Sequence, residues 1–186
     1  GHIWAYSGQK GLNLYFNGKS VALVYDWCYG APSWDSTFTA EVSAALIAQG
    51  NVIADSGGTE QNTNSASNWQ GLRGSSAVLC FLASDDSFTG TRYTNMYNKT
   101  RSYLRDNLGT DPLSRGWNIE GIGYLGYPYA TVIPAVIAAK RDNPANDIAS
   151  GFAAMDYALW TQYAATVRFL RDDQVWLLHP DFGDDN

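Results

Sequence analysis

The sequence predicts a single α/β domain over residues 1–186, with a mainly parallel sheet between two layers of helices. Three observations lead to this fold class. Short apolar runs such as VALVY (21–25) and AVLCFL (77–82) are typical of buried strands. Segments with helical spacing of apolar residues separate these runs, and glycine- or aspartate-rich turns follow most of them. Alternating strands and helices imply right-handed βαβ units and a sheet covered on both faces.

The N-terminal third is predicted to hold a β-hairpin, a strand, a helix and a second strand. Two short β segments split by glycines precede the buried run 21–25. After a turn-rich stretch, residues 37–50 place Phe38, Val42, Ala45 and Leu46 on one helical face, and Gly50 ends that helix. The next predicted strand, NVIADSGG (51–58), has a polar and glycine-rich exit.

The rest of the chain is expected to continue this alternation. Residues 62–76 suggest a short helix or turn before the strand 77–82, and residues 91–109 predict an amphipathic helix. A strand over 116–128 precedes a helix over 129–145 that Pro134 interrupts. A long helix over 147–173 leads to the last strand, Val175 to Leu178. Aspartate and serine at positions such as Asp35 and Ser36 are expected to cap the following helices.

The ends of the predicted strands indicate a candidate site. Ligands of open parallel sheets bind outside the carboxyl ends of the strands. The first strand would deliver Asp26, Trp27 and Cys28 there, the third Ser84 and Asp85, and the last His179 and Asp181. A carboxylate beside an imidazole orients the ring and raises its pKa, as acid–base chemistry requires. We therefore expect His179, Asp181, Asp26 and Cys28 as candidate catalytic residues.

Composition limits the partners. Twelve basic and eighteen acidic residues give a formal charge of -6, which disfavours nucleic acid and anionic membrane surfaces. No apolar stretch approaches the roughly 20 residues of a spanning helix, and no signal peptide leads the chain, so we expect a soluble protein. Low lysine, abundant Asn, Tyr and Trp, and the sequon Asn98-Lys99-Thr100 favour a secreted or periplasmic protein, with a cytoplasmic one as the alternative. The oligomeric state stays open.

The cysteines bear on two questions, whether the chain forms a disulfide and whether it binds a metal. Cys28 and Cys80 sit in or just after apolar runs, and we expect them to remain unpaired. No Cys-x-x-Cys spacing occurs in the chain, and we expect neither a metal nor another cofactor.

Two stretches resemble one known superfamily. GIGYLGYPYAT (121–131) resembles the strand-turn-helix elbow of class I glutamine amidotransferase-like proteins, and VWLLHPDF (175–182) resembles the strand that carries their catalytic histidine. The resemblance implies a flavodoxin-like fold, with His179 as the base and Asp181 as its acid. Pro128 stands where that family has its cysteine nucleophile, so glutamine hydrolysis by the usual route is excluded.

A competing resemblance covers the first half of the chain. SVALVYDW (20–27), NVIADSGG (51–58) and residues 68–88 look like the start of a TIR-like domain, with a serine in place after the third strand. The helix that would carry the NAD-cleaving glutamate of that family, 89–104, contains no acid. This resemblance implies at most a scaffold without NAD hydrolysis.

Two functions follow from these features. The first is a hydrolase- or transferase-like enzyme that acts on a small neutral or carbohydrate-type ligand, because aromatic rings stack on sugar faces. The second is a carbohydrate- or protein-binding module without catalysis. Either function would use ligand-binding residues beside glycine, proline and the predicted strand ends: Trp27, Tyr29, Trp34, Ser84, Asp85, Tyr127 and Tyr129.

Overall fold

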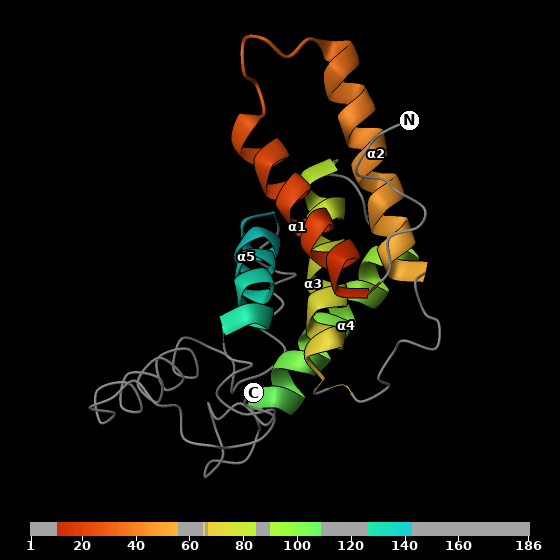
Figure 1. Cartoon of the computed structure of the whole chain (residues 1–186), viewed down its shortest axis with the longest axis vertical. Coiled ribbons are helices and arrows are strands. Elements are labelled where there is room, and N and C mark those ends of the chain that lie inside the picture. Colours follow the sequence, from red (N-terminus) through yellow and green to blue (C-terminus); the bar gives the residue numbers. More distant parts are fainter. Residues whose placement is uncertain (1–10, 56–64, 66, 85–89, 109–125, 143–186) are drawn as a thin grey trace, which may run out of the picture.

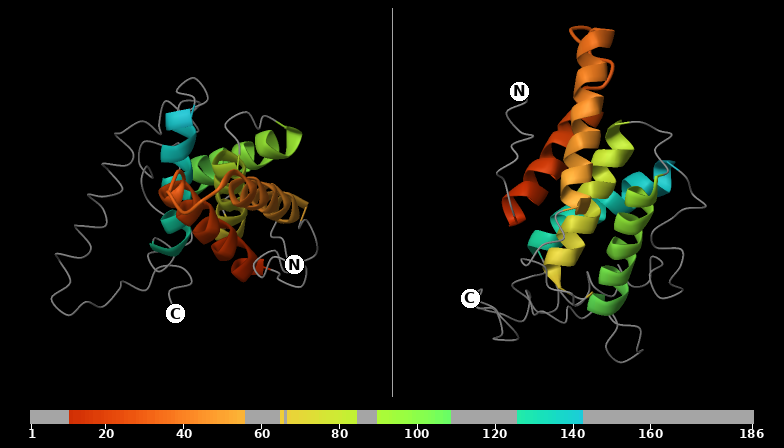
Figure 2. Two further views of the ribbon diagram at one scale, coloured as in Figure 1. Left: turned by 90° about the horizontal axis from the view of Figure 1, so that it is seen from above. Right: turned by 90° about the vertical axis from the view of Figure 1, so that its right-hand side faces the viewer.

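The computed structural model describes residues 11–55, 65, 67–84, 90–108 and 126–142, and within these ranges the chain forms five α-helices and no strand. The helices are α1 (Gly11–Cys28), α2 (Ser36–Asp55), α3 (Asn68–Ser84), α4 (Thr91–Leu108) and α5 (Gly126–Asp142), as Figure 1 shows. α3 lies at the centre and contacts each of the other four helices (Figures 1 and 2). α1 and α2 form a hairpin whose turn projects beyond the other helices (Figure 1). No helix in these ranges has the length and apolar character needed to span a membrane.

The predicted three-layer α/β fold is wrong for the described part of the chain. The run 21–25 lies inside α1, the run 77–82 lies inside α3, and residues 51–55 form the end of α2. A short apolar run fits a helix that is buried on all sides as well as it fits a buried strand. α3 is such a helix, because every residue from Gln70 to Phe81 is buried and no polar face reveals the helical period. The strand expected at 175–178 lies outside the described residues.

The other element predictions had mixed outcomes. Residues 11–20, assigned to a β-hairpin, begin α1, and residues 126–128, assigned to the end of a strand, begin α5. The flavodoxin-like elbow is therefore also wrong, since its Gly126-Tyr127-Pro128 forms a helical turn. The helix predicted over 37–50 is confirmed as part of α2, but Gly50 does not end it, because α2 continues to Asp55. The helices predicted over 91–109 and 129–145 are confirmed as far as Leu108 and Asp142. A single domain over 1–186 stays a prediction.

Local sequence signals explain the turn between α1 and α2. Gly30 has a φ of 79°, a left-handed conformation that glycine adopts without steric cost, and it reverses the chain after α1. The Asp35 carboxylate accepts a hydrogen bond of 2.7 Å from the backbone N–H of Phe38. Asp35 is thus the N-cap of α2, as its sequence position predicted.

Three outer helices, α1, α4 and α5, bury one face each. The buried positions recur every three or four residues, as in α1 at Leu14, Tyr15, Gly18, Ala22 and Tyr25, and in α4 at Tyr93, Met96, Thr100, Tyr103, Leu104 and Asn107. α5 buries Tyr129, Val132, Ala135, Val136 and Ala139 in the same way, although Pro134 interrupts its hydrogen-bond ladder. α2 buries side chains only in its C-terminal half, because its N-terminal half belongs to the projecting hairpin.

Small residues allow the outer helices to approach α3 closely. A Cβ atom added at Gly74 of α3 would lie 2.9 Å from the Met96 carbonyl oxygen and 3.0 Å from the Thr100 nitrogen, both on the backbone of α4. A Cβ at Gly71 would meet the Tyr103 ring at 2.6 Å. At the interface with α2, Gly50 faces the Phe81 ring, and its added Cβ would come within 2.6 Å of that ring. The interfaces of α3 with α2 and α4 therefore depend on positions without a side chain.

Polar side chains of α3 form hydrogen bonds with its neighbours. The Ser76 hydroxyl donates to the carbonyl of Tyr15, and the Cys80 thiol lies 3.4 Å from the carbonyl of Gly18, both in α1. Arg73 Nε donates to the Ile53 carbonyl at 3.0 Å, and its Nη2 donates to the carbonyl of Ala54. Buried polar groups with partners avoid the free-energy cost of desolvation without compensation.

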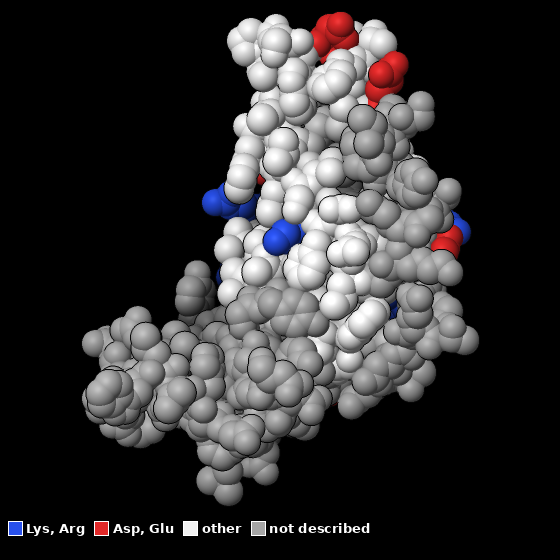
Figure 3. Space-filling view, viewed as in Figure 1, with Lys and Arg blue, Asp and Glu red and all other residues white. Residues whose placement is uncertain are grey.

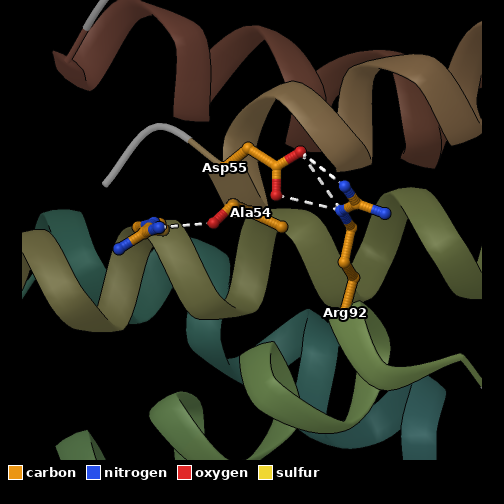
Figure 4. A network of polar contacts seen from close by, with 4 residues as sticks. Ala54, Asp55 and Arg92 are labelled. Carbon is orange, nitrogen blue, oxygen red and sulfur yellow. Dashed lines mark hydrogen bonds and ion pairs between the residues drawn. The ribbon is translucent and has the colours of Figure 1, made fainter. Parts of the chain in front are cut away.

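Two arginines hold the C-terminal end of α2. Arg73 of α3 binds the last carbonyls, which carry the negative end of the helix dipole. Figure 4 shows Arg92 of α4 reaching Asp55 with two nitrogens, at 2.9 Å each to separate carboxylate oxygens. The hydrogen bond from Arg92 lowers the pKa of Asp55. This ion pair is exposed, so its contribution to stability is small.

The two cysteines are free thiols in different environments. Cys28 is exposed at the end of α1, whereas Cys80 is buried in α3. Burial raises the pKa of the Cys80 thiol to about 12, because the thiolate would lose its hydration.

Gly74→Ala tests the close contact between α3 and α4. Alanine has the higher helix propensity, by about 1 kcal/mol, yet its Cβ would overlap the α4 backbone. We expect the overlap to dominate and the free energy of unfolding to fall by about 1–3 kcal/mol in urea denaturation. Ser20→Ala, at an exposed position of α1, serves as the control and should change it by less than about 0.5 kcal/mol. A stabilised Gly74→Ala protein would contradict the described packing.

Thiol titration tests the placement of the two cysteines. In the native protein we expect Cys28 to react with a disulfide reagent while Cys80 stays unreactive, because it is buried and remains protonated at neutral pH. One thiol should be counted before unfolding and two afterwards. Two reactive thiols in the native state, or none, would show that the placement is incorrect.

Candidate functional site

The described residues of the predicted site lie on α1, on the α1–α2 turn, on α3 and on α5. Asp26, Trp27 and Cys28 form the last turn of α1, and Tyr29 and Trp34 lie in the turn that follows. Ser84 ends α3, and Tyr127 and Tyr129 belong to the first turn of α5. Asp85, His179 and Asp181 lie outside the described residues. No sheet edge gathers these positions in the described ranges, so the reason given for grouping them is wrong.

Two of the predicted ligand-binding residues, Tyr129 and Ser84, are buried. Tyr129 is 2% exposed, its ring lies against Tyr103, and its hydroxyl donates to the Asn107 side chain at 3.0 Å. Ser84 is buried, and its hydroxyl donates to the carbonyl of Phe81 at 2.9 Å. Both side chains are thus positioned within the helix packing.

Aromatic rings cluster at the α1–α2 turn. Tyr25 stacks on Trp34 with ring centroids 5.6 Å apart, and Trp34 meets Phe38 edge-on at 5.0 Å. Tyr29 packs against Tyr25 at 5.7 Å, yet it remains 66% exposed. These contacts hold the projecting hairpin together, since offset and edge-to-face pairs are the favourable geometries of aromatic rings.

Asp26 and Trp27 lie together on the rim of a cleft between α1 and α5. The cleft has a volume of about 480 Å³. Its floor is apolar and comes from α3, and its walls come from α1 and α5; the floor and wall residues are Ala22, Leu23, Leu79, Leu82, Ala83, Pro134, Ile137 and Ala138. The cleft exists because α1 and α5 each pack on α3, leaving the α3 surface open between them.

The rim of this cleft combines one aromatic ring with three charges. Trp27 is 76% exposed, the largest exposed fraction among the described large hydrophobic residues. Asp26 lies beside it on α1, and Arg141 and Asp142 lie on the last turn of α5. Carboxylates accept hydrogen bonds and a guanidinium donates them, so the rim offers both kinds of partner to a polar ligand.

Charged side chains are sparse over α1 and α2 in the view of Figure 1. Figure 3 shows mostly uncharged side chains over α1 and α2, with acidic residues at the far end of the hairpin.

In the described ranges, no group of three or more His, Cys, Asp or Glu side chains is placed to hold a metal ion.

Sequence reasoning found Asp26 and Trp27 and missed the α5 side of the cleft. Arg141 and Asp142 end α5 and lie near the end of the predicted helix 129–145, so charged residues after an apolar stretch were the available signal. Their proximity to Asp26 depends on helix packing, which no local pattern encodes.

Comparison of the chain with protein-family models, curated proteins and solved structures gives no match. The predicted resemblance to class I glutamine amidotransferase-like proteins is wrong, because the described residues form helices without a sheet and no family model supports it.

Proposed function

We propose that this chain is a ligand-binding module, and that its α1–α5 cleft binds a small neutral molecule of the carbohydrate type. The observation that carries the proposal is the exposure of Trp27 beside an apolar cleft. A tryptophan ring is usually well covered in folded proteins, and 76% exposure leaves a large apolar surface in water. A sugar ring presents an apolar face that can cover such a surface.

The rim charges favour a neutral, hydroxyl-rich ligand. Asp26 and Asp142 contribute two negative charges and Arg141 one positive charge, so the described rim is negative overall. The chain as a whole also carries a net charge of -6, which adds a repulsive field for anions. Hydroxyl groups can donate to the carboxylates and accept from the guanidinium, without any charge on the ligand.

The cleft has the dimensions of a small-molecule site. Its volume of about 480 Å³ falls within the roughly 300–1,000 Å³ that is typical of ligand pockets. A stable protein partner would instead need about 800 Å² of surface on each side, much of it outside the cleft. The apolar floor at Leu79, Leu82 and Ala83 suits the less polar face of a bound sugar.

Calorimetry with a panel of neutral disaccharides, such as maltose, cellobiose and mannobiose, tests this proposal. Trp27→Ala should weaken binding by about tenfold or more, because it removes the stacking surface. Tyr29→Ala is the matched control, since Tyr29 is also exposed and close in sequence but does not line the cleft. Its affinity should stay within about twofold of the wild type.

The same experiment separates binding from catalysis. Release of reducing sugar from the bound disaccharide, and its loss in Asp26→Asn, would assign the cleft to an enzyme. Binding without turnover is the expected result. Absence of binding across the panel, or equal affinities for wild type and Trp27→Ala, would contradict the proposal.

A further inference from the structure

A second cavity lies between α3 and α4, beside the C-terminal end of α2. It has a volume of about 440 Å³. Its polar lining comes from Gln70 and Arg73 on α3 and from Asn95, Asn98, Lys99 and Ser102 on α4. Ser65 also lines the cavity, so the described lining contains two cations, three amides and two hydroxyls, and no carboxylate.

Arg73 supplies a fixed positive charge at the wall of this cavity. It is only 5% exposed, and its Nε and Nη2 donate to the carbonyls of Ile53 and Ala54 at the end of α2. These bonds set the position of the guanidinium, whose charge also interacts with the Asp55 carboxylate.

Lys99 supplies a second positive charge with donors to spare. Its ammonium donates to the Gln70 side-chain oxygen at 3.2 Å, and an ammonium has three N–H groups, so a ligand can bind while this bond is kept. Burial, together with the charge of Arg73, lowers the pKa of Lys99. The positive charge of Arg73 thus disfavours the protonated form of Lys99.

The packing of α3 against α4 brings these cations together. Gly74, next to Arg73 in sequence, faces Thr100, next to Lys99, at a distance that excludes a side chain. Two carboxylates lie nearby. Asp55 binds Arg92 and also interacts electrostatically with Arg73, whereas Asp106 binds Arg105 and accepts a hydrogen bond from Ser65, which lines the cavity. An anion placed between Arg73 and Lys99 would relieve their repulsion.

We propose that this cavity binds a phosphate group, either free or on a small phosphorylated molecule. A phosphate carries about -1.5 to -2 charges at neutral pH and so matches two cations, whereas a carboxylate matches one. The net charge of -6 opposes anions over the chain as a whole, whereas the charged side chains in the described lining of this cavity are both positive. The Asn95, Asn98 and Ser102 side chains can bind hydroxyl groups on the rest of the molecule.

Calorimetry at constant ionic strength tests the site with inorganic phosphate, glycerophosphate and glycerol. We expect both phosphates or glycerophosphate alone to bind, and glycerol not to bind. Equal binding of the two phosphates identifies the free anion as sufficient, whereas binding of glycerophosphate alone identifies a phosphorylated molecule. Binding of glycerol as tight as that of glycerophosphate would overturn the proposal.

Substitution of Lys99 makes the test specific to this cavity. Lys99→Gln should weaken phosphate binding by about tenfold or more, and Lys99→Arg should restore it, because only the latter keeps the charge. Lys19→Gln removes a cation from α1, outside the cavity, and should leave affinity within about twofold. Phosphate should also raise the unfolding midpoint of the wild type but not of Lys99→Gln. Equal affinity or an equal midpoint shift in the two proteins would overturn the proposal.

Discussion

The burial of α3 among four other helices is the constraint on which the rest of the structure depends. A helix in this position needs small residues where neighbours approach and partners for every polar group. α3 meets both needs: Gly71 and Gly74 face α4, Ser76 bonds to α1, and Arg73 bonds to the end of α2. The sequence NWQGLRGSSAVLCFLAS therefore specifies a buried helix by size and hydrogen bonding more than by hydrophobicity.

Both candidate sites are consequences of this central helix. Where α1 and α5 pack on α3 without covering it completely, the apolar α3 surface becomes the floor of the cleft that carries Trp27 and Asp26. Where α4 approaches α3 at Gly74, the adjoining Arg73 and Lys99 face one cavity. One side of α3 thus offers a weakly acidic, apolar cleft and another offers a cationic, polar cavity. The two sites suit ligands of different charge, and their linings have no residue in common.

The sequence allowed prediction of α4 and of most of α2 and α5, but not of α1 or of the central α3. α4 and residues 37–50 of α2 carry regular apolar spacing, and Asp35 has the position of an N-cap, so the helical structure of these segments was predictable. The run 77–82 was misassigned because continuous burial removes the periodicity that separates helix from strand. Asp26 and Trp27 were selected as residues at a strand end, and they line a cleft for a different reason, the packing of α1 beside α5. The cationic cavity required tertiary contacts, because Arg73 and Lys99 lie far apart in the chain.

Hydrogen exchange tests the central position of α3 most directly. Amides in a helix buried on every side exchange only through the largest unfolding events, whereas those of exposed or peripheral segments exchange through local opening. Peptides that cover residues 70–81 should be the slowest of the described chain to exchange, and those of the α1–α2 turn, 29–35, should be among the fastest. Exchange at 70–81 that is as fast as in α4 or in the N-terminal half of α2 would contradict the account, because it would show that α3 opens without disrupting its neighbours.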